Sequence, residues 1–425
     1  MDSAWVVGSL AAATFAVIVV FLGLVIWSIR RHRDPDMKIE CDAGLEELMP
    51  TLAGLSLGSA IEGNAVEILE NGKLWDVLIE RIGKARHTVH YETFLWEEGK
   101  LGKRMAKALA ERAKEGVKVR IMLDARGSKN IGKTERETME KAGAKVVCFH
   151  EANLHNIGVM NDRTHRKMLV IDGKEAFVGG HCVVDTWLGD AEDKKHNADV
   201  SVRVRGPVVH SLQSCFSENW CGETGELFAG PDVFPALKPA GDLVMHLVYA
   251  KPENSAPAVK IAHYAAICLA RKRIWIQNPY FIPDPDAIHG LRDAVKRGVD
   301  VRVLMPSTSG SDNPMVQHAG HRNFERLMRD GVRLFEYPHT LLHQKIMTVD
   351  GVYSLVGSAN FDDRSFETND EVTLGILDPA TTEKLDGIFE KYVKRAEEID
   401  LAKWRRRSVL HKIRDYAAYS INELL

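Results

Sequence analysis

Closely spaced pairs of cysteines are absent from this sequence. None of its six cysteines stands in a Cys-x-x-Cys pair, the spacing typical of many zinc and redox sites. Scattered single cysteines are more typical of buried, reduced thiols, which favours a reducing compartment. They are Cys41, Cys148, Cys182, Cys215, Cys221 and Cys268.

The chain also lacks an excess of positive charge. Its formal net charge is −3 at pH 7, so no global basic field attracts nucleic acid, although a local basic groove stays open. We therefore expect no nucleic-acid partner. With 425 residues the chain is too long for a single core, and it suits two domains of ordinary size.

Charge is missing altogether between Ser3 and Ile29. This apolar run is long enough to cross ~30 Å of hydrocarbon, and a cluster of arginines follows it directly. A cleaved signal peptide is the alternative, but its positive residues would precede the apolar run. We predict one transmembrane helix, with residues 1–33 forming the anchor and its basic flank. The positive-inside rule places the rest of the chain in the cytoplasm, beneath the cell membrane.

After an expected linker over residues 34–60, strand and helix patterns alternate, and the alternation occurs twice. "KEGVKVRIMLD" in the first half aligns with "KRGVDVRVLMP" in the second. We predict two tandem α/β domains, each a mixed, largely parallel sheet flanked by helices, related by a pseudo-twofold axis. The expected bounds are 61–230 and 243–400, with a Gly- and Pro-rich junction at 231–242.

The last segment, residues 401–425, has arginines and apolar residues at helical spacing. A basic amphipathic helix of this kind can lie on an anionic membrane surface. The alternative is a helix that packs on the body and exposes a basic face to solvent, and the sequence leaves both open.

Both halves carry the same rare pattern, His-x-Lys-x4-Asp followed by Gly. The two copies are His165, Lys167 and Asp172, and His343, Lys345 and Asp350. In a strand, residues two apart point to the same face, so each His and Lys project together. Asp-Gly is also a preferred dipeptide of tight hairpin turns. Each aspartate has therefore a catalytic interpretation and a purely turn-forming one.

Two His-Lys pairs suit displacement at a phosphodiester. The ammonium groups stabilise charge on the non-bridging oxygens. One imidazole attacks phosphorus and forms a phosphohistidine, while the other protonates the departing alcohol. The lysines supply the electrostatic stabilisation, so we expect neither metal nor other cofactor. His150, His155, His165 and His181 are conceivable metal ligands, but a lysine in the centre of the motif opposes a cation.

This duplicated motif resembles the signature of the phospholipase D superfamily, and the continuation "GSANFDDRS" (Gly357–Ser365) is similar to it as well. "YETFLWEEGKLG" (Tyr91–Gly102) and "NPYFIPD" (Asn278–Asp284) are most similar to bacterial cardiolipin synthases. The resemblance covers roughly residues 60–400.

The resemblance implies roles for particular residues. It implies that the six motif residues are catalytic, with His165 the nucleophile by analogy. It also implies site roles for Ser358, Asn360, Asp199 and Glu371, the last two by hydrogen bonding to a catalytic histidine. Two features depart from the family: Cys182 stands where an asparagine is usual, and many relatives carry two N-terminal spans.

The implied activity is condensation of two phosphatidylglycerols into cardiolipin and glycerol at a membrane. A phospholipase D that uses water and yields phosphatidic acid is the first alternative. A nuclease is the second, and the net charge and the predicted anchor count against it. A non-catalytic membrane scaffold is the third, although a scaffold needs neither His-Lys pair.

Overall fold

The computed structural model describes residues 8–9, 12–22, 43–151, 162–250 and 257–420. It divides the chain into two units, residues 1–38 and residues 39–425, which are described separately. In the first unit, residues 8–9 and 12–22 are helical with exposed side chains. Within the described ranges, no helix combines the length and the apolarity needed to span a membrane. Most of the predicted anchor, residues 1–33, lies outside these ranges.

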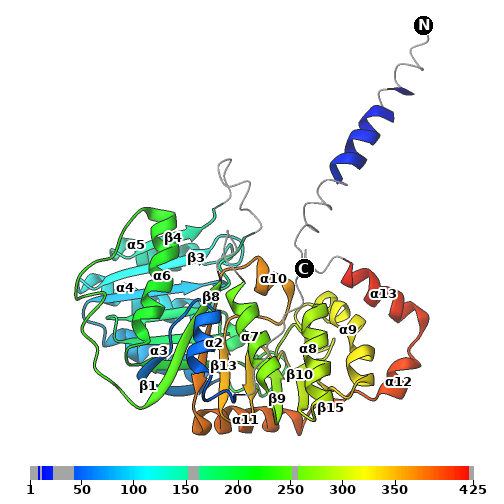
Figure 1. The fold of residues 1–425 in the computed structure, drawn as a ribbon. Coiled ribbons are helices and arrows are strands. Elements are labelled where there is room, and N and C mark those ends of the chain that lie inside the picture. The colour runs from blue at the N-terminus through cyan, green and yellow to red at the C-terminus, as the bar shows by residue number, and fades with distance from the viewer. Residues whose placement is uncertain (1–7, 10–11, 23–42, 152–161, 251–256, 421–425) are drawn as a thin grey trace. The chain divides into compact units, whose positions relative to one another are not determined.

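The second unit is built on one continuous sheet of 15 strands with helices against it (Figure 1). From one edge to the centre, the first half contributes β4 (Lys145–Phe149), β3 (Lys118–Asp124), β2 (Thr88–Thr93), β5 (Met168–Ile171), β6 (Glu175–Gly179), β7 (Val200–Arg205) and β1 (Ile61–Glu70). The second half continues with β8 (Leu243–Ala250), β14 (Glu371–Leu377), β13 (Tyr353–Gly357), β12 (Ile346–Val349), β9 (Arg273–Gln277), β10 (Asp300–Pro306), β11 (Arg333–Tyr337) and β15 (Glu397–Glu398).

The strand order is mirrored about the central pair β1 and β8. These two strands run antiparallel, and each half then repeats the same sequence of neighbours outward from them. The prediction of two similar α/β halves is therefore confirmed. β1 begins at Ile61 and β8 at Leu243, the residues at which the two domains are expected to start.

The prediction of largely parallel sheets is wrong. Among the strands that the structure describes, only four neighbouring pairs are parallel, β2–β3 and β3–β4 in the first half and β9–β10 and β10–β11 in the second. The other ten pairs are antiparallel. The cause is the hairpin that follows each His-Lys pair, β5–β6 or β12–β13, because its first strand pairs antiparallel with the βαβ strands and each strand after it reverses direction again.

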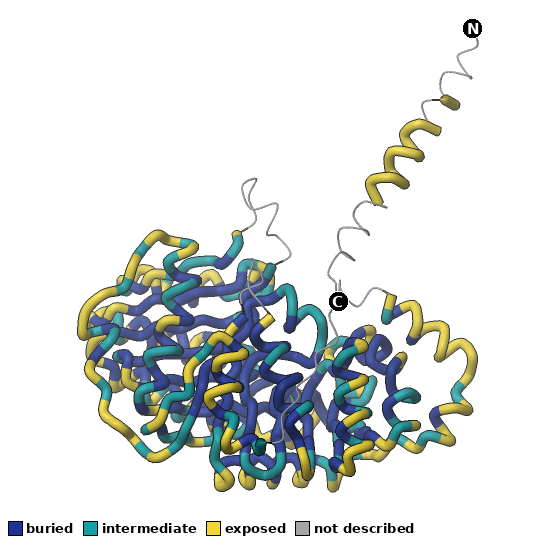
Figure 2. The backbone as a smooth tube through the Cα atoms, viewed as in Figure 1, coloured by how far each residue is buried: buried dark blue, intermediate teal, exposed yellow. Residues whose placement is uncertain are grey.

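Helices cover the sheet in matching positions in the two halves. They are α3 (Lys73–Gly83), α4 (Lys100–Lys114), α5 (Lys133–Lys141) and α6 (Val209–Thr224), then α7 (Ala258–Leu269), α8 (Pro285–Lys296), α9 (Pro314–Arg329), α10 (Asp363–Glu367) and α11 (Pro379–Val393). Their apolar stripes face the sheet, as Leu74, Leu78 and Ile82 of α3 show. One buried cluster contains Val204 from the first half and Leu374 from the second, so the halves share a core (Figure 2).

Short helices lie at both ends of the second unit. α2 (Met49–Leu55), within the expected linker, buries Met49 and Leu52 and packs on α7. In the tail, α12 (Leu401–Arg405) and α13 (Val409–Tyr419) pack along α9. This contact agrees with the alternative in which the tail packs on the body, but the face that α13 exposes is apolar as well as basic.

The outward face of α13 carries large apolar side chains. Val409 and Leu410 are 72% and 77% exposed, and Ile413 and Tyr416 are each 59% exposed. The helix buries Asp415 instead, and Figure 2 shows most of its length as exposed. An amphipathic helix normally buries its apolar face, so this orientation needs a reason.

Candidate active site

The backbone brings each His-Lys motif to the other half of the molecule. His165 and His343 lie in extended segments just before β5 and β12. The amide of His165 donates to the carbonyl of Asp370 at 2.9 Å, and the amide of His343 donates to that of Ala198 at 2.7 Å. Each acceptor directly precedes an acidic residue of the opposite half, so these two bonds align the motifs with two carboxylates.

The imidazoles and carboxylates pair across the two halves. His165 Nδ1 lies 2.8 Å from Glu371 Oε1, and His343 Nδ1 lies 2.8 Å from Asp199 Oδ2. A carboxylate only accepts, so each Nδ1 carries the proton and each Nε2 presents a lone pair. All four side chains are buried. Neither half contains a complete pair, and the site exists only where the halves meet.

Different groups support the two carboxylates. The Ser358 hydroxyl donates to Glu371 Oε2, whereas the Trp187 indole donates to Asp199 Oδ2 at 2.9 Å. Gly180 takes the place of Ser358 in the first half, and a Cβ there would lie 2.4 Å from Asp199 Oδ1. The first half therefore needs glycine at this position and uses an indole in place of the hydroxyl. The sequence analysis missed Trp187, since no motif marks it.

Two buried lysines stand beside the imidazoles. Lys167 Nζ donates to the backbone carbonyl of His165 at 2.7 Å and lies over the Phe94 ring. Lys345 Nζ donates to the carbonyl of His343 at 2.8 Å and lies 3.0 Å from Nε2 of the same residue. Burial lowers the pKa of both lysines, that of Lys345 to about 7. An anionic ligand would offset this loss by stabilising the ammonium forms.

Electrostatics leave both imidazoles neutral at neutral pH. Burial is the largest influence on His165 and His343, and the pKa of each falls to about 4. Burial by itself raises the pKa of Asp199 and Glu371, but the neighbouring imidazoles and ammonium groups outweigh it and lower both to about 2. The resting site thus contains two carboxylates and two unprotonated Nε2 atoms, one of them beside an ammonium.

A cavity of about 290 Å³ opens beside His165. Part of its lining is apolar and aromatic: Phe94, Tyr280, Ile282 and Val316. Asn360, implied as a site residue, also lines it, and its Oδ1 is buried and makes no hydrogen bond to any described residue. Cys182, at the corresponding place in the first half, is buried and directs its thiol to the Gly180 carbonyl. The two halves therefore differ on the cavity side of the site.

The cavity is also cationic. Arg126, Arg163 and Arg364 line it. Asp362 and Asp363 line it as well, but burial raises the pKa of these carboxyls to about 6 and about 7. Near neutral pH the guanidinium groups are therefore not fully balanced by these acids. Sequence reasoning did not single out these arginines, because only the fold brings them to one place.

Asp172 and Asp350 lie at the far end of the motif hairpins. The carboxylate of Asp172 accepts from the backbone amides of Arg86, His87 and Thr88, and that of Asp350 accepts from those of Arg271, Lys272 and Arg273. Both have positive φ, 52° and 56°, as the first residue of a type I′ turn requires. Seven extended residues span roughly 20 Å. The structure does not bring these aspartates to the histidines, and it favours their turn-forming interpretation.

The histidines considered as metal ligands have other partners. His181 lies within hydrogen-bond distance of Ser201 Oγ and of the Asn71 carbonyl, and His150 lies near Glu223. His155 lies outside the described residues. In the described ranges, none of these histidines belongs to a cluster with metal-binding spacing.

Comparisons with known proteins agree with this geometry. Residues 78–220 and 264–393 match the family described as "Cardiolipin synthase, PLD-like domain". The chain is 32% identical over 387 residues to cardiolipin synthase 2 of Bacillus anthracis, which covers 90% of this chain and 75% of that protein. It is 35% identical over 341 residues to cardiolipin synthase A of Pseudomonas putida, covering 80% and 70%.

Solved structures show the same fold at low identity. Phosphatidylserine synthase of Haemophilus influenzae superposes with a TM-score of 0.64 at 13% identity, over 85% of this chain and 95% of that one. Polyphosphate kinase of Porphyromonas gingivalis superposes with a TM-score of 0.55 at 15% identity, over 87% and 52%. With both family segments matched and both His-Lys motifs in one site, the chain belongs to the cardiolipin synthase family with phospholipase D-like domains.

Proposed function

We propose that the protein transfers a phosphatidyl group from one phosphatidylglycerol to the glycerol headgroup of a second, producing cardiolipin and free glycerol. The observation that carries this proposal is the pair of imidazoles, each oriented by a carboxylate of the other half and each with the buried lysine of its own motif beside it. Residues 61–230 and 243–400 are the two domains that supply one His-Lys pair each.

In the first step, His165 Nε2 attacks phosphorus and the P–O bond to glycerol breaks. Lys345 passes a proton to the adjacent Nε2 of His343, which delivers it to the departing glycerol oxygen. In the second step, His343 removes a proton from the hydroxyl of the second phosphatidylglycerol, whose oxygen attacks phosphorus as the P–N bond breaks. Lys345 regains its proton from His343 in the second step, and Lys167 stabilises the charge on the non-bridging oxygens throughout.

Two contacts support this division of roles. His165 borders the cavity, where a substrate phosphorus can approach its Nε2. The Nε2 of His343 faces Lys345 Nζ at 3.0 Å, so a cationic proton donor stands beside it. A lone pair that receives a proton suits a general acid, and one that faces open space suits a nucleophile.

The cavity suits a second phospholipid headgroup. A phosphodiester bound among Arg126, Arg163 and Arg364 would place its glycerol hydroxyl toward His165, where the first phosphoryl group is attached. Asn360 offers an amide to the same headgroup. Water competes for the phosphohistidine, so binding the alcohol in place is what separates a transferase from a hydrolase.

Membrane association has two supports. The uncharged run from Ser3 to Ile29, followed by arginines, suits a single-pass anchor with the catalytic domains on the cytoplasmic side. The outward apolar face of α13, with Lys412 and Arg414 exposed on the same helix, suits contact with anionic lipid. Phosphatidylglycerol is itself anionic, and a nucleic-acid partner is not part of the proposal.

Mass spectrometry of the lipids formed by the purified full-length protein in phosphatidylglycerol vesicles tests the proposal. The expected products are cardiolipin and glycerol, with cardiolipin in excess of phosphatidic acid. If phosphatidic acid predominates at every phosphatidylglycerol content, the protein is a phospholipase and the transferase proposal fails. The His165→Ala protein is the control for contaminating activity.

A further inference from the structure

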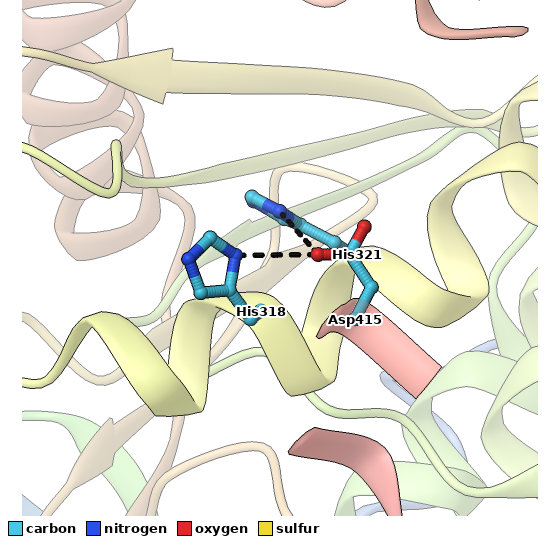
Figure 3. A group of neighbouring side chains, drawn as sticks. All are labelled: His318, His321 and Asp415. Carbon is cyan, nitrogen blue, oxygen red and sulfur yellow. Dashed lines mark ion pairs between the residues drawn. The ribbon is translucent and has the colours of Figure 1, made fainter. Parts of the chain in front are cut away.

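A second cluster of titratable side chains lies where the tail helix α13 meets α9. His318 and His321 are three residues apart on α9, so they share one face of that helix, and Asp415 of α13 points between them (Figure 3). Asp415 Oδ1 lies 3.2 Å from His318 Nδ1 and 3.8 Å from His321 Nδ1. All three residues are more than nine-tenths buried.

These close contacts are not hydrogen bonds. His318 Nδ1, His321 Nδ1 and Asp415 Oδ1 are all buried, and none of them makes a hydrogen bond in the structure. The carboxylate and the two imidazoles form ion pairs only when the histidines are protonated, and three buried polar atoms without a hydrogen bond within 4.8 Å of one another are costly. A cation bound by all three would remove that cost.

The other polar atoms of two of these residues are held in place. His321 Nε2 lies 3.1 Å from Glu336 Oε1 of β11. Asp415 Oδ2 accepts from Arg407 Nη1 at 2.8 Å, and that guanidinium stacks on Trp404. Metal-binding histidines and carboxylates typically have such partners, which orient them and fix the tautomer. Here the partners leave His321 Nδ1 and Asp415 Oδ1 turned toward the shared centre.

We propose that His318, His321 and Asp415 bind one divalent transition-metal ion of the zinc type, which fastens α13 to α9. Two imidazoles and one carboxylate are a typical ligand set for zinc, with water as the fourth ligand. Bonds of about 2.0–2.2 Å in a tetrahedral site separate neighbouring ligand atoms by roughly 3.3 Å, close to the two N–O distances above.

The ion explains the orientation of α13. Holding Asp415 against α9 keeps Val409, Leu410, Ile413 and Tyr416 on the outer side of the helix. The metal is structural and takes no part in the proposed phosphoryl chemistry, which needs no metal. The inference does not depend on the proposed function.

Metal analysis of the full-length protein tests the site. The protein is purified with a tag that contains no histidine, dialysed against zinc and then against buffer, and its bound zinc is measured. We expect one equivalent in the wild type and in His289→Gln, which alters an exposed histidine of α8. We expect at least a fivefold loss in His318→Gln/His321→Gln and in Asp415→Asn. Equal zinc in the wild type and in these variants would overturn the proposal.

Cobalt binding provides a test that does not depend on the folding of any variant. Titration of the zinc-free wild type with Co²⁺ should produce visible absorption bands of low coordination number that saturate at one equivalent. Zinc should then abolish them. If no such bands form, the three residues are only a buried ion-pair cluster and the metal site does not exist.

Discussion

At the scale of single residues, each imidazole of the proposed active site depends on a carboxylate that is distant in sequence. Glu371 lies 206 residues from His165, and Asp199 lies 144 residues from His343. The carboxylates fix the tautomers, so Nε2 of each ring carries the lone pair that the proposed mechanism uses. Their own supports differ, a serine hydroxyl on one side and an indole on the other.

Removing either negative charge should therefore slow the chemistry without unfolding the protein. We expect Glu371→Gln and Asp199→Asn each to lower kcat by about 100-fold or more, since the amide cannot stabilise the correct tautomer or the imidazolium. Steady-state assays of cardiolipin formation measure the effect. Glu383→Gln, an exposed change on α11, is the matched control and should keep the wild-type rate. Near-normal rates in both site variants would show that the pairing is not catalytic.

The expected pH dependence of the activity follows from the protonation states of Lys345 and of the proposed nucleophile His165. His165 must be neutral to attack, and with its pKa at about 4 it loses activity only as the pH falls through that value. Lys345 must be charged, and with its pKa at about 7 it loses that charge as the pH rises through neutrality. We expect kcat/KM, which reports the free enzyme, to fall on the alkaline side from about pH 7.

The Lys345→Arg variant tests whether loss of the Lys345 charge causes the alkaline fall in kcat/KM. Arginine stays charged at all accessible pH values, so the alkaline fall should move upward by more than about one pH unit even if the rate is lower. An alkaline limb that is identical in the two proteins would assign it to another group.

At the scale of secondary-structure elements, the motif hairpin is a positioning device. The segment that leads into its first strand holds His and Lys, and its Asp-Gly turn is bound at the other end to the backbone where the neighbouring strand begins. The aspartate of each motif thus helps to fix the strand register, that of β5 against β2 in the first half and that of β12 against β9 in the second.

Loss of this turn contact should affect stability more than catalysis. We expect Asp172→Ala to lower the free energy of unfolding by about 1–3 kcal/mol, because a charged acceptor of backbone amides is removed. The kcat at low temperature should change by less than about threefold. Thermal unfolding and kcat are measured together, with Asp76→Ala, which breaks an exposed ion pair, as control. A stable Asp172→Ala protein with no activity would restore the catalytic interpretation.

Some elements of the fold could be predicted from the sequence, and others could not. The hairpins around Asp172 and Asp350 were predictable because turn chemistry and strand alternation are local. The duplication was predictable because the pattern of "KEGVKVRIMLD" recurs in "KRGVDVRVLMP" and the His-x-Lys-x4-Asp motif occurs in both halves. Strand direction was not predictable, because no local feature of the sequence shows whether β12 pairs with β9 in parallel or in antiparallel orientation. Trp187, Arg126 and the His318–Asp415 contact depend on packing between distant segments, which no periodicity encodes.

At the scale of the whole molecule, the mirrored sheet creates one site from two halves, and the tail places an apolar surface outside it. This surface, formed by Val409, Leu410, Ile413 and Tyr416, is too apolar for a face that meets only water. With exposed basic residues on the same helix, it matches the interface of an anionic bilayer.

A charge placed in that surface should weaken membrane binding while sparing the site. We expect Ile413→Glu to bind phosphatidylglycerol vesicles several-fold more weakly than Thr134→Glu, which adds the same charge at an exposed position of α5. Both proteins should retain kcat in detergent micelles. Sedimentation with vesicles, using chains that lack residues 1–33 so that the anchor does not dominate, measures the difference. Equal binding would remove α13 from the membrane contact.

The central claim is that the two halves form one site in which His165 carries the phosphatidyl group. Rapid quenching with alkali, which preserves phosphohistidine, followed by peptide mass spectrometry of the full-length protein after brief exposure to phosphatidylglycerol, tests it most directly. We predict a phosphatidyl adduct on the peptide that contains His165, and none on the one that contains His343. An adduct on His343 alone would reverse the roles, and no adduct on either histidine, with cardiolipin still forming, would contradict the covalent mechanism.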